Sequence, residues 1–595
     1  MLILGLSSLN HDTAAALFED GTVKAAIEED KLTRSRSTGV PQNAIRFCLE
    51  TAGATWGDLD AIALATHPFV GWRRRSLSSL GLAASSPRAI AFHQANELGQ
   101  LARDLGQLRT LRSHINGMGS KITTFDHQLC HAASAFFLSP FDRALVLTMD
   151  GEGDGCAGMI AIGEGTQLQV LRKILFPHSL AWLYSQVTEL LGFVPHHDEH
   201  KTQWLSLEGK PVFKSVFLDM FRRRRNQTLV LDRSYLSLTD RLRLSGKFHR
   251  AVGLPEKDGE PDDDLSRNLA SSLQAACFEL VGSTIEHFRT SEGVQRVCLA
   301  GGLLQNTLLV STLEQRLGAG EVFVPPAPGN PGCALGAGLL LWHHEKQRPR
   351  LPAVRYLYSG PSGGRSEVKD VFDSCKARYS LQTTVERKLD ATLELLQSGK
   401  IVGWFQGAAE FGPRALGNRS LLASPWAPYV KENLNDYIKH REWFRPFAVS
   451  VPAEDCARYF ECSALCQSMS SLAAVKPESN VLPEGFILPG NLVRLHVVEK
   501  KGNPVLWQLL KRFGERAPAP MLVNTSFNVF GEPLVARPRD AVRSYFCSGI
   551  DALVIENFVI SKSPPKVVPF TFSASRPLPK EIRGSSPNSP SRVPA

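Results

Sequence analysis

Apolar and polar positions follow the same pattern twice in the first part of the chain, at residues 2–30 and 144–173. The first copy is LILGLSSLNHDTAAALFEDGTVKAAIEED, and the second is ALVLTMDGEGDGCAGMIAIGEGTQLQVLRK. Each copy predicts an apolar strand, a polar turn that carries Asp or Gly, a second strand, a "DG" or "EG" hairpin turn and a third strand. The repeat predicts a duplicated α/β lobe.

Glycine follows a further apolar strand in RVCLAGGLLQN. A Pro/Gly loop then leads into a small-residue helix in VFVPPAPGNPGCALGAGLLLW. Glycine after a strand lets the backbone approach a ligand closely, and helix N-termini attract phosphate. Gly301 and Gly302 alone fit an ordinary tight turn equally well. Together with the repeated turns and the glycine-rich helix start, they predict a nucleotide cleft between two lobes.

The composition shifts to Pro, Gly and charge around residues 344–365. We place a domain boundary there, between residues 1–350 and 351–563. The second part predicts another α/β domain, with strands in KIVGWFQG, LLAS, FAVSV, PMLVNTSF and ALVIENFVIS. Residues 564–595 hold eight prolines, many serines and a net charge of +4, and they predict a disordered tail.

The composition is that of an ordinary globular protein, with 43% hydrophobic and 21% charged residues in a chain of 595. No apolar run reaches the ~18–20 residues that a membrane span needs. The start, MLILGLSSLNHD, lacks a basic n-region and predicts a first β-strand rather than a signal peptide. The eleven cysteines are scattered and none forms a CxxC pair. This argues against a zinc ribbon or a disulfide framework and predicts a reduced, cytoplasmic setting.

The net charge of +9 includes the +4 of the tail, so it does not decide the function. Arg73–Arg75 and Arg222–Arg225 are local basic clusters. They predict solvated helix faces, with contact to nucleic acid or an acidic partner as the alternative. No continuous basic stripe runs through the motif regions, so we expect no nucleic-acid partner.

Two histidines stand four residues apart in DHQLCHAASAFF, at His127 and His131. Residues at i and i+4 are neighbours on a helix surface, so two imidazoles with this spacing can converge on one ion. Capping, packing or solvated histidines are the alternatives, and the pair needs a third ligand. Asp150 ends the strand ALVLTMD nineteen residues after His131. It completes a candidate site for iron, zinc or manganese, unless it caps a turn or holds Mg²⁺ on phosphate.

Basic and amide groups concentrate in three later stretches, EFGPRALGNRS, KHREWFRPFAVSV and LVNTSFNVFGEP. Arginine forks together with hydroxyl or amide donors bind phosphate and stabilise charge that develops in phosphoryl or adenylyl transfer. Surface arginines paired with Glu410 and Glu442 are the alternative. The stretches contribute Arg414, Arg419, Lys439, Arg441, Arg445, Asn524, Thr525, Ser526 and Asn528.

The chain resembles the O-carbamoyltransferase family of nodulation protein U and the cephalosporin and tobramycin carbamoyltransferases. The resemblance runs from Met1 to about Ser563. Its motifs, specific in combination and order, are NHDTAAALFEDG, EEDKLTR, DHQLCHAASAFF, MDGEGD, SLAWLYSQVTELLGF, GGLLQN, PGNPGCALGAG, EFGPRALGNRS, FRPFAVSV and NTSFNVFGEP.

This resemblance implies an N-terminal domain of the actin/hexokinase-like ATPase fold, close to the tRNA threonylcarbamoyl transferase, and a C-terminal domain similar to YrdC. It implies that the C-terminal domain makes carbamoyl-adenylate from carbamoyl phosphate and Mg-ATP, releasing pyrophosphate and phosphate. The N-terminal domain, with a bound divalent metal that is iron in the family picture, would pass the carbamoyl group to a hydroxyl of a small natural product. A homodimer is expected by analogy.

The resemblance also implies roles for individual residues. The metal ligands are His127, His131 and Asp150, with Asn330 where relatives have an aspartate as fourth ligand. His11 is the expected general base for the acceptor hydroxyl. The residues expected to hold carbamoyl phosphate and nucleotide in the second domain are Arg414, Lys439, Arg445, Arg494, Asn524, Ser526 and Asn528. Those expected around the cleft of the first domain are Asn10, Asp12, Gly151, Lys201, Gly301, Gly302 and Asn306.

Departures from the family pattern leave other functions open. Besides Asn330, the chain has EHKTQWLSLEG where relatives have roughly EYKVMGLAPYG, and Phe530 where a basic residue is common. A nucleotide-binding pseudo-enzyme or scaffold of a biosynthetic complex is therefore one alternative. A tRNA threonylcarbamoylation enzyme, which would share both domain types, is the other.

Overall fold

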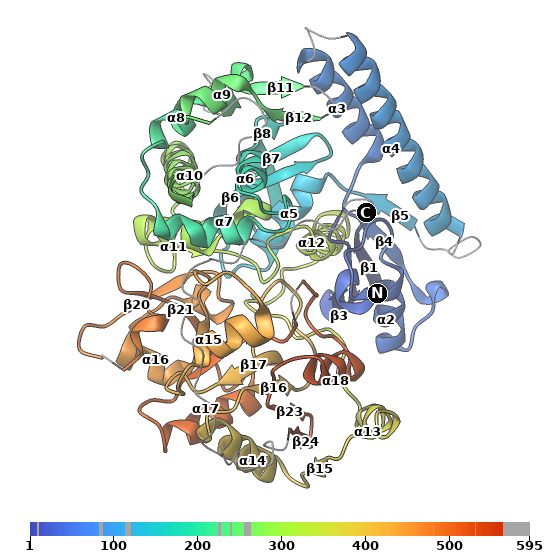
Figure 1. Cartoon of the computed structure of the whole chain (residues 1–595). Helices are drawn as coiled ribbons and strands as arrows, with labels where there is room; N and C mark the ends of the chain where they lie inside the picture. The colour runs from blue at the N-terminus through green and yellow to red at the C-terminus, as the bar shows by residue number, and fades with distance from the viewer. Residues whose placement is uncertain are drawn as a thin grey trace, which may run out of the picture. The chain divides into compact units, whose positions relative to one another are not determined.

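Two five-stranded sheets with the same strand order make up the N-terminal part of the fold (Figure 1). The first, in the order β3-β2-β1-β4-β5, consists of β1 (Leu2–Ser7), β2 (Ala14–Glu19), β3 (Thr22–Glu28), β4 (Ala61–Leu64) and β5 (Lys121–Thr124). The second, in the order β14-β13-β6-β7-β8, consists of β6 (Arg143–Gly153), β7 (Cys156–Glu164), β8 (Gln167–Leu175), β13 (Val297–Ala300) and β14 (Val322–Phe323).

Strand directions match between the two sheets as well. In each, the first three strands in sequence form an antiparallel meander, and the last two add in parallel on the other side of the first strand. This confirms the predicted duplication and the α/β class, with the actin/hexokinase-like arrangement that the resemblance implied.

This computed structural model describes residues 1–8, 11–82, 87–113, 121–223, 228–238, 241–254, 263–479, 481–529 and 531–562. Residues 1–561 form one compact unit. The predicted tail, Asn10 and Phe530 lie outside the described residues. None of the described helices has the length and apolar character that crossing a bilayer requires.

Helices α5 (His127–Phe137) and α12 (Gly332–Leu340) lie against each other in the N-terminal part. Asp126 caps α5, because its carboxylate accepts hydrogen bonds from the backbone N–H groups of Gln128 and Leu129 at 3.1 and 3.3 Å. A Cβ added at Gly336 would lie 1.9 Å from the carbonyl oxygen of Cys130. Only glycine therefore permits the close approach of α12 to α5, which fits the predicted small-residue helix.

A ten-stranded mixed sheet forms the C-terminal part, in the order β15-β24-β23-β16-β17-β22-β18-β21-β20-β19. Its strands are β15 (Ser380–Leu381), β16 (Val402–Phe405), β17 (Arg419–Ala423), β18 (Ala448–Pro452), β19 (Phe460–Glu461), β20 (Leu472–Val475), β21 (Leu492–Val498), β22 (Leu522–Ser526), β23 (Ala552–Ile555) and β24 (Phe558–Ser561). All five stretches that predict strands contribute to it, and the α/β class of this part is confirmed, whereas the domain boundary at residue 350 stays a prediction. The specific likeness to YrdC stays a prediction.

Helices cover both faces of this sheet, because neighbouring strand residues point to opposite sides. Val402 and Trp404 pack with α14 (Val385–Gln397) and α17 (Pro504–Gly514), whereas Phe405 packs in a second core. That second core contains residues of α13 (Arg365–Ser374), α15 (Val430–Leu434), α16 (Ala453–Tyr459) and α18 (Pro538–Phe546).

The remaining α-helices belong to the N-terminal part. They are α1 (Glu29–Thr33), α2 (Gln42–Ala52), α3 (Pro68–Leu82), α4 (Pro87–Ser113), α6 (Leu180–Leu190), α7 (Glu199–Leu205), α8 (Lys214–Asp219), α9 (Gly246–Ala251), α10 (Asp263–Glu292) and α11 (Thr307–Leu317). Two short hairpins pair β9 (Phe221–Arg223) with β10 (Leu229–Leu231) and β11 (Leu236–Leu238) with β12 (Leu242–Leu244).

Lys31, in α1, connects the N-terminal part to the C-terminal part. Its buried ammonium donates to the carboxylate of Glu28 at 2.9 Å and to the carbonyl oxygens of Glu410 and Gly412 at 2.9 and 2.8 Å. A buried ammonium with three acceptors is fully satisfied, so this contact fixes α1 against the loop before β17.

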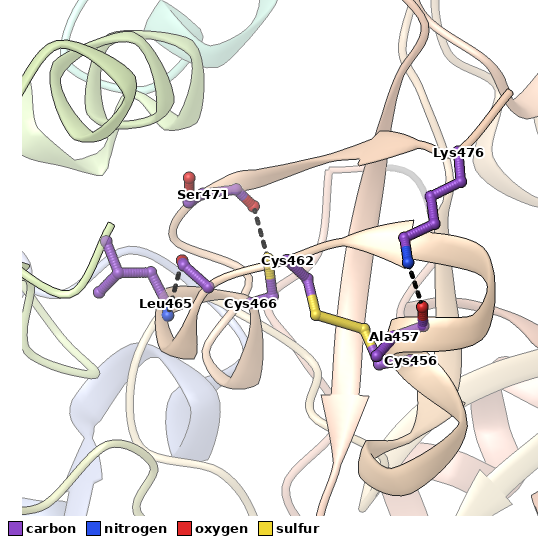
Figure 2. Close-up of a disulfide and its surroundings, with 8 residues drawn as sticks. Cys456, Ala457, Cys462, Leu465, Cys466, Ser471 and Lys476 are labelled. Carbon is purple, nitrogen blue, oxygen red and sulfur yellow. Dashed lines mark hydrogen bonds between the residues drawn. A yellow bond between two sulfur atoms is a disulfide. The ribbon is translucent and has the colours of Figure 1, made fainter. Parts of the chain in front are cut away.

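The cysteines are reduced, with one exception. Cys456 in α16 and Cys462 just after β19 are joined by a disulfide, which Figure 2 shows. The prediction of reduced cysteines is wrong at this pair, because the turn from helix to strand brings together two residues that are six apart in sequence. The other nine cysteines are free, so one bond and not a framework is present.

The two basic clusters also differ from each other. Arg74 is paired with Asp126 at 3.3 Å, and Arg75 with Glu97 at 2.6 Å. The prediction of a solvated helix face is therefore wrong for these two arginines, because acidic partners from α4 and the α5 cap draw them inward. Arg222 is exposed, as predicted, and pairs with Asp232, but it lies in strand β9 and not on the predicted helix face. Arg224 and Arg225 lie outside the described residues.

Candidate active site and metal centre

A cavity of about 800 Å³ gathers predicted site residues from distant parts of the chain. A cavity of this size accommodates a ligand larger than a single nucleotide base. The predicted residues that line it come from the turn between β1 and β2, from β6, from the segment between β13 and α11, from the loop before α12, and from the end of β22 and the loop after it. They are His11, Asp12, Asp150, Gly151, Gly302, Asn306, Asn330, Ser526 and Asn528.

His127 and His131 face Asp150 inside the N-terminal part. Their Nε2 atoms lie 3.4 and 3.6 Å from the Asp150 carboxylate, and their ring centroids are 4.8 Å apart. All three side chains are buried. Position Gly153 permits this approach, because a Cβ there would lie 2.1 Å from the His127 ring. The spacing in DHQLCHAASAFF therefore brings both imidazoles to one carboxylate.

Several buried polar atoms around this point have no hydrogen-bond partner. They are His127 Nε2, both ring nitrogens of His131 and the amide oxygen of Asn330. An unsatisfied buried polar atom costs roughly 1–3 kcal/mol, so a cluster of them calls for a missing partner. Imidazole nitrogens, a carboxylate and an amide oxygen are all donors to divalent metals, and they fit such an ion.

Without an ion, the charges at this point shift the pKa values of all three groups. Burial lowers the pKa of His127, but the hydrogen bond and charge of Asp150 outweigh burial and raise it to about 9. Burial lowers the pKa of His131. Burial also raises the pKa of Asp150, but the two histidines hold it well below its usual range. A positive charge is therefore favoured between the carboxylate and the imidazoles.

Cys333 is a further donor that the motifs did not single out. Its Sγ lies within 4.8 Å of ligand atoms of His127 and His131, and the side chain is buried. It follows Asn330 by three residues in PGNPGCALGAG, where Asn330 lies in the loop before α12 and Cys333 in the first turn of the helix. We call His127, His131, Asp150, Asn330 and Cys333 the metal centre.

His11 lies at the cavity wall beside Asp12. Its Nδ1 is 2.9 Å from the Asp12 carboxylate, which can only accept, so Nδ1 carries the proton and Nε2 keeps a free lone pair. This hydrogen bond is the main reason that the pKa of His11 is raised. The amide of Asn330 donates to the His11 carbonyl oxygen at 3.4 Å and ties the loop to the metal centre.

The glycine turn after β13 contacts the same carboxylate. The Gly302 N–H donates to Asp150 at 3.0 Å. Gly301 has a φ of 100°, and a Cβ there would lie 2.2 Å from the Met149 carbonyl oxygen, so glycine is required. Asn306 caps α11 by accepting from Leu309 N–H at 2.9 Å, so its side chain has a structural role as well as a place in the cavity wall.

Five cations form a basic cluster in the C-terminal part, in which Lys439 is buried and Arg414, Arg441, Arg445 and Arg494 are half-buried. Burial lowers the pKa of Arg494 well below its usual value, and the charges of Arg414, Arg441 and Arg445 lower it further. The same causes, burial first, lower the pKa of Lys439. Such mutual repulsion in a buried place is relieved by an anion.

The contacts of the cluster leave its charge largely uncompensated. Lys439 Nζ donates to Asn528 Oδ1 at 2.6 Å and to the Ser526 hydroxyl at 3.2 Å, and both of these residues line the cavity. Arg414 donates to the carbonyl oxygen of Gln305 at 2.9 Å. Arg494 Nε and Arg441 Nη2 have no hydrogen-bond partner. Arginines paired with Glu410 and Glu442 were the alternative, and only Arg445 has such a pair, with Glu442 at 3.4 Å.

Two predicted binding residues have partners of their own. Lys201, in α7, is paired with Asp198 at 3.1 Å and with Glu442 at 2.8 Å, so it supports the basic cluster through Glu442. Asn524 points into the sheet, where its amide donates to the Ser450 hydroxyl at 3.0 Å. Arg441 belongs to the cluster although the resemblance did not select it. Its position in KHREWFRPFAVSV, between Lys439 and Arg445, was the available signal.

Family models identify the class of protein. The carbamoyltransferase N-terminus model matches residues 2–339, and the carbamoyltransferase C-terminus model matches residues 393–562. Together they span most of the chain, which therefore belongs to the carbamoyltransferase family. The prediction of a carbamoyltransferase is confirmed.

Individual relatives agree with this family. Nodulation protein NolNO of Sinorhizobium fredii is 33% identical over 562 residues, which cover 93% of this chain and 79% of that protein. An uncharacterized protein of Synechocystis sp. is 33% identical over 601 residues, covering 94% and 97%. Nodulation protein U of Bradyrhizobium diazoefficiens is 26% identical over 594 residues, covering 95% and 99%. The predicted resemblance to nodulation protein U is confirmed.

Solved structures similar to this chain include HypF of T. kodakarensis, with 13% identity and a TM-score of 0.31, covering 59% of this chain and 48% of that one. The ROK hexokinase of Thermus thermophilus has 13% identity and a TM-score of 0.29, covering 57% and 98%. These TM-scores are low, so the description of the fold rests on the strand order and directions given above.

Proposed function

We propose that this carbamoyltransferase is an ATP-dependent O-carbamoyltransferase. It forms carbamoyl-adenylate from carbamoyl phosphate and Mg-ATP and transfers the carbamoyl group to a hydroxyl of a small natural product. One observation carries the proposal. A basic cluster with little counter-charge contacts the same cavity wall that His11 and the metal centre share.

In the first reaction, carbamoyl phosphate loses phosphate to water and yields carbamate. A carbamate oxygen then attacks the α-phosphorus of ATP, and pyrophosphate leaves. The basic cluster supports this step, because Arg414, Arg445 and Arg494 offer guanidinium groups to phosphate oxygens. Lys439, held by Ser526 and Asn528, adds a fixed positive charge where negative charge accumulates.

In the second reaction, the acceptor hydroxyl attacks the carbamoyl carbon, and AMP leaves. His11 takes the hydroxyl proton at Nε2, while Asp12 holds Nδ1–H and so orients the ring. The metal ion would be held by His127, His131 and Asp150 and would polarise the carbamoyl carbonyl as a Lewis acid. The resemblance implies iron there, and two imidazoles with one carboxylate suit iron, zinc or manganese.

The proposal assigns the transfer reaction to residues 1–350 and adenylate formation to residues 351–563. Both donor substrates are metabolites of the cytoplasm, where we expect the protein to act. A biosynthetic role in secondary metabolism, such as modification of an antibiotic, follows from the same resemblance, and a homodimer stays a prediction. Lys201 and Asn306 contribute by positioning neighbours, since their polar groups already have partners.

The test is pyrophosphate release from ATP and carbamoyl phosphate, without acceptor, on wild type and on Lys439→Met. We expect release by wild type and a loss of about 100-fold or more in the variant, because one buried charge on the reacting phosphates is removed. Lys369→Met is the control, since Lys369 is an exposed lysine of the same domain, paired with Asp373. Absence of release from folded wild type would contradict the proposal.

A further inference from the structure

The donor atoms of the metal centre carry less negative charge than a divalent ion needs, if Cys333 is left aside. Asp150 contributes one carboxylate, whereas His127, His131 and Asn330 are neutral as ligands. A buried ion with a net charge of +1 would be costly in this closed environment. The buried carboxylate of Asp154 also lies nearby, but it accepts hydrogen bonds from Thr66 and from the N–H groups of His67 and His127. Cys333 can supply a second negative charge as a ligand, since metal-bound cysteine is a thiolate.

We infer that Cys333 is a thiolate ligand of the metal centre, and that the centre takes a thiophilic divalent ion, Zn²⁺ or its surrogate Co²⁺, in preference to iron or manganese. The inference rests on the proposed function only in placing a metal at this centre.

The packing of two helices fixes the thiol beside the imidazoles. Gly336 touches the backbone of Cys130 in α5, and Cys333 stands one helical turn before Gly336 on the same face of α12. That face is directed at the turn of α5 that carries His127 and His131. Donor atoms of the three residues already lie within 4.8 Å of one another, so a small side-chain adjustment completes a ligand set.

Competing partners for these donors are weak. The one hydrogen bond of the Cys333 thiol among the described residues is a 3.9 Å contact to the His127 carbonyl oxygen, and a thiol is a poor donor. Among the described residues, neither ring nitrogen of His131 has a hydrogen-bond partner, although Nε2 lies 3.6 Å from the Asp150 carboxylate. An ion would therefore replace little and would satisfy several buried atoms at once.

Ligand chemistry decides which ion is preferred. Thiolate and imidazole select zinc over manganese and magnesium, which favour oxygen donors, and two histidines with a single carboxylate and open positions are typical of non-haem iron. Adding a thiolate makes the ligand set less like that of a non-haem iron site and more like that of a zinc site. When the ion binds, the metal–sulfur bond forms, the S–H bond breaks and the proton passes to solvent, which leaves the site neutral overall.

Cobalt spectroscopy tests the inference on the full chain without any turnover. Protein stripped with a chelator is titrated with Co²⁺. We expect one equivalent to bind and to give a near-ultraviolet thiolate-to-cobalt charge-transfer band together with visible bands of cobalt. Cys333→Ser should lose the charge-transfer band and keep the visible ones. Cys130→Ala is the matched control, because Cys130 is equally buried and lies on the same helix as the histidines.

A competition experiment supplies the second measurement. Affinities for Zn²⁺ and Mn²⁺ are measured against a chelator on wild type, Cys333→Ser and Cys333→Ala, with circular dichroism as the check on folding. We expect both variants to lose about 100-fold or more in Zn²⁺ affinity and to change little toward Mn²⁺.

Bound Co²⁺ without the charge-transfer band, or a band that survives in Cys333→Ser, would overturn the inference. Equal losses for Zn²⁺ and Mn²⁺ would overturn the metal preference. Pyrophosphate release is measured separately, so failure of this inference remains distinguishable from failure of the adenylation chemistry.

Discussion

The metal centre and the basic cluster are both incomplete, but in opposite senses. In the metal centre, a carboxylate and two imidazoles face one another with unsatisfied nitrogens, and a cation is missing. In the basic cluster, burial and the charges of neighbouring arginines lower the pKa values of Lys439 and Arg494, and an anion would relieve this repulsion. Both contact one cavity wall.

The difference shows how a buried charge pattern indicates its ligand. Buried ionisable groups are normally paired, because an isolated charge in a protein interior is destabilising. Where the pairing is incomplete, the sign of the excess charge indicates the sign of the ligand. The metal centre is therefore expected to bind a metal ion and the basic cluster phosphate groups, and the two functions should be separable by mutation.

The largest effect is expected from His131→Ala. Removal of one of the two imidazoles should abolish stoichiometric metal binding, a loss of more than about 100-fold in affinity, because one of the strong donors of the metal centre is lost. Metal content after dialysis measures this. Pyrophosphate release without acceptor should stay within about twofold of wild type. A large loss of release would show that the two centres are not independent.

Arg494→Met is the reciprocal variant. The side chain is half-buried, forms no ion pair with a carboxylate of the described residues and faces other arginines, so its loss should leave the fold intact and weaken phosphate binding. We expect pyrophosphate release to fall about 100-fold, in line with the loss of a charge-assisted contact in a water-poor site. Metal content should not change. Unchanged release would remove Arg494 from the binding site.

Lys201→Met gives a smaller effect that connects the two regions. Lys201 holds Glu442, which in turn pairs with Arg445, so the variant should leave Arg445 less well oriented. We expect the KM for carbamoyl phosphate to rise about tenfold with a smaller change in kcat. In a double-mutant cycle with Glu442→Gln, the two effects should not add. Additive effects would rule out this coupling.

The smallest expected effect concerns Asp30, an acidic residue of the cavity wall. Burial, followed by the nearby Glu28, raises the pKa of Asp30 to about 6 from an ordinary value of 3.8. The folded state therefore binds this proton more tightly than the unfolded state does. The contribution of the bound proton to the free energy of unfolding is lost as the pH rises through about 6.

Asn does not ionise, so Asp30→Asn removes the destabilisation that the buried carboxylate causes at high pH. The variant should melt a few degrees above wild type at about pH 8, and the difference should shrink at about pH 5, where wild-type Asp30 is protonated in the folded protein. Thermal unfolding at the two pH values measures this. A constant difference at both would mean that titration of Asp30 is not its cause.

Local patterns predict most of the fold. The strand periodicity and the hairpin turns in both repeats depend on near neighbours in sequence, and so does the four-residue spacing of His127 and His131. Asp150 is predictable because it directly follows the apolar run of the strand after α5, and that strand continues to Gly153. These features need no knowledge of how helices pack.

Features that depend on tertiary packing could not be predicted in this way. The proximity of Cys333 to the histidines depends on the backbone contact between Gly336 and Cys130, which are more than two hundred residues apart. Asn524 and Ser526 share a face of β22, but only the residue at the strand end reaches the cavity wall. The disulfide of Cys456 depends on the turn between α16 and β19.

The contact at Gly336 has a consequence for genetics. This glycine supplies no donor atom and touches no ligand, yet any larger residue would push α12 away from α5 and carry Cys333 with it. In a deep mutational scan that selects for the metal-dependent reaction, position 336 would therefore tolerate as few substitutions as the ligands themselves. Intolerance in such a map would then report the spacing of two helices, and only a measurement of metal content would separate the residues that bind the ion from the residue that makes room for it.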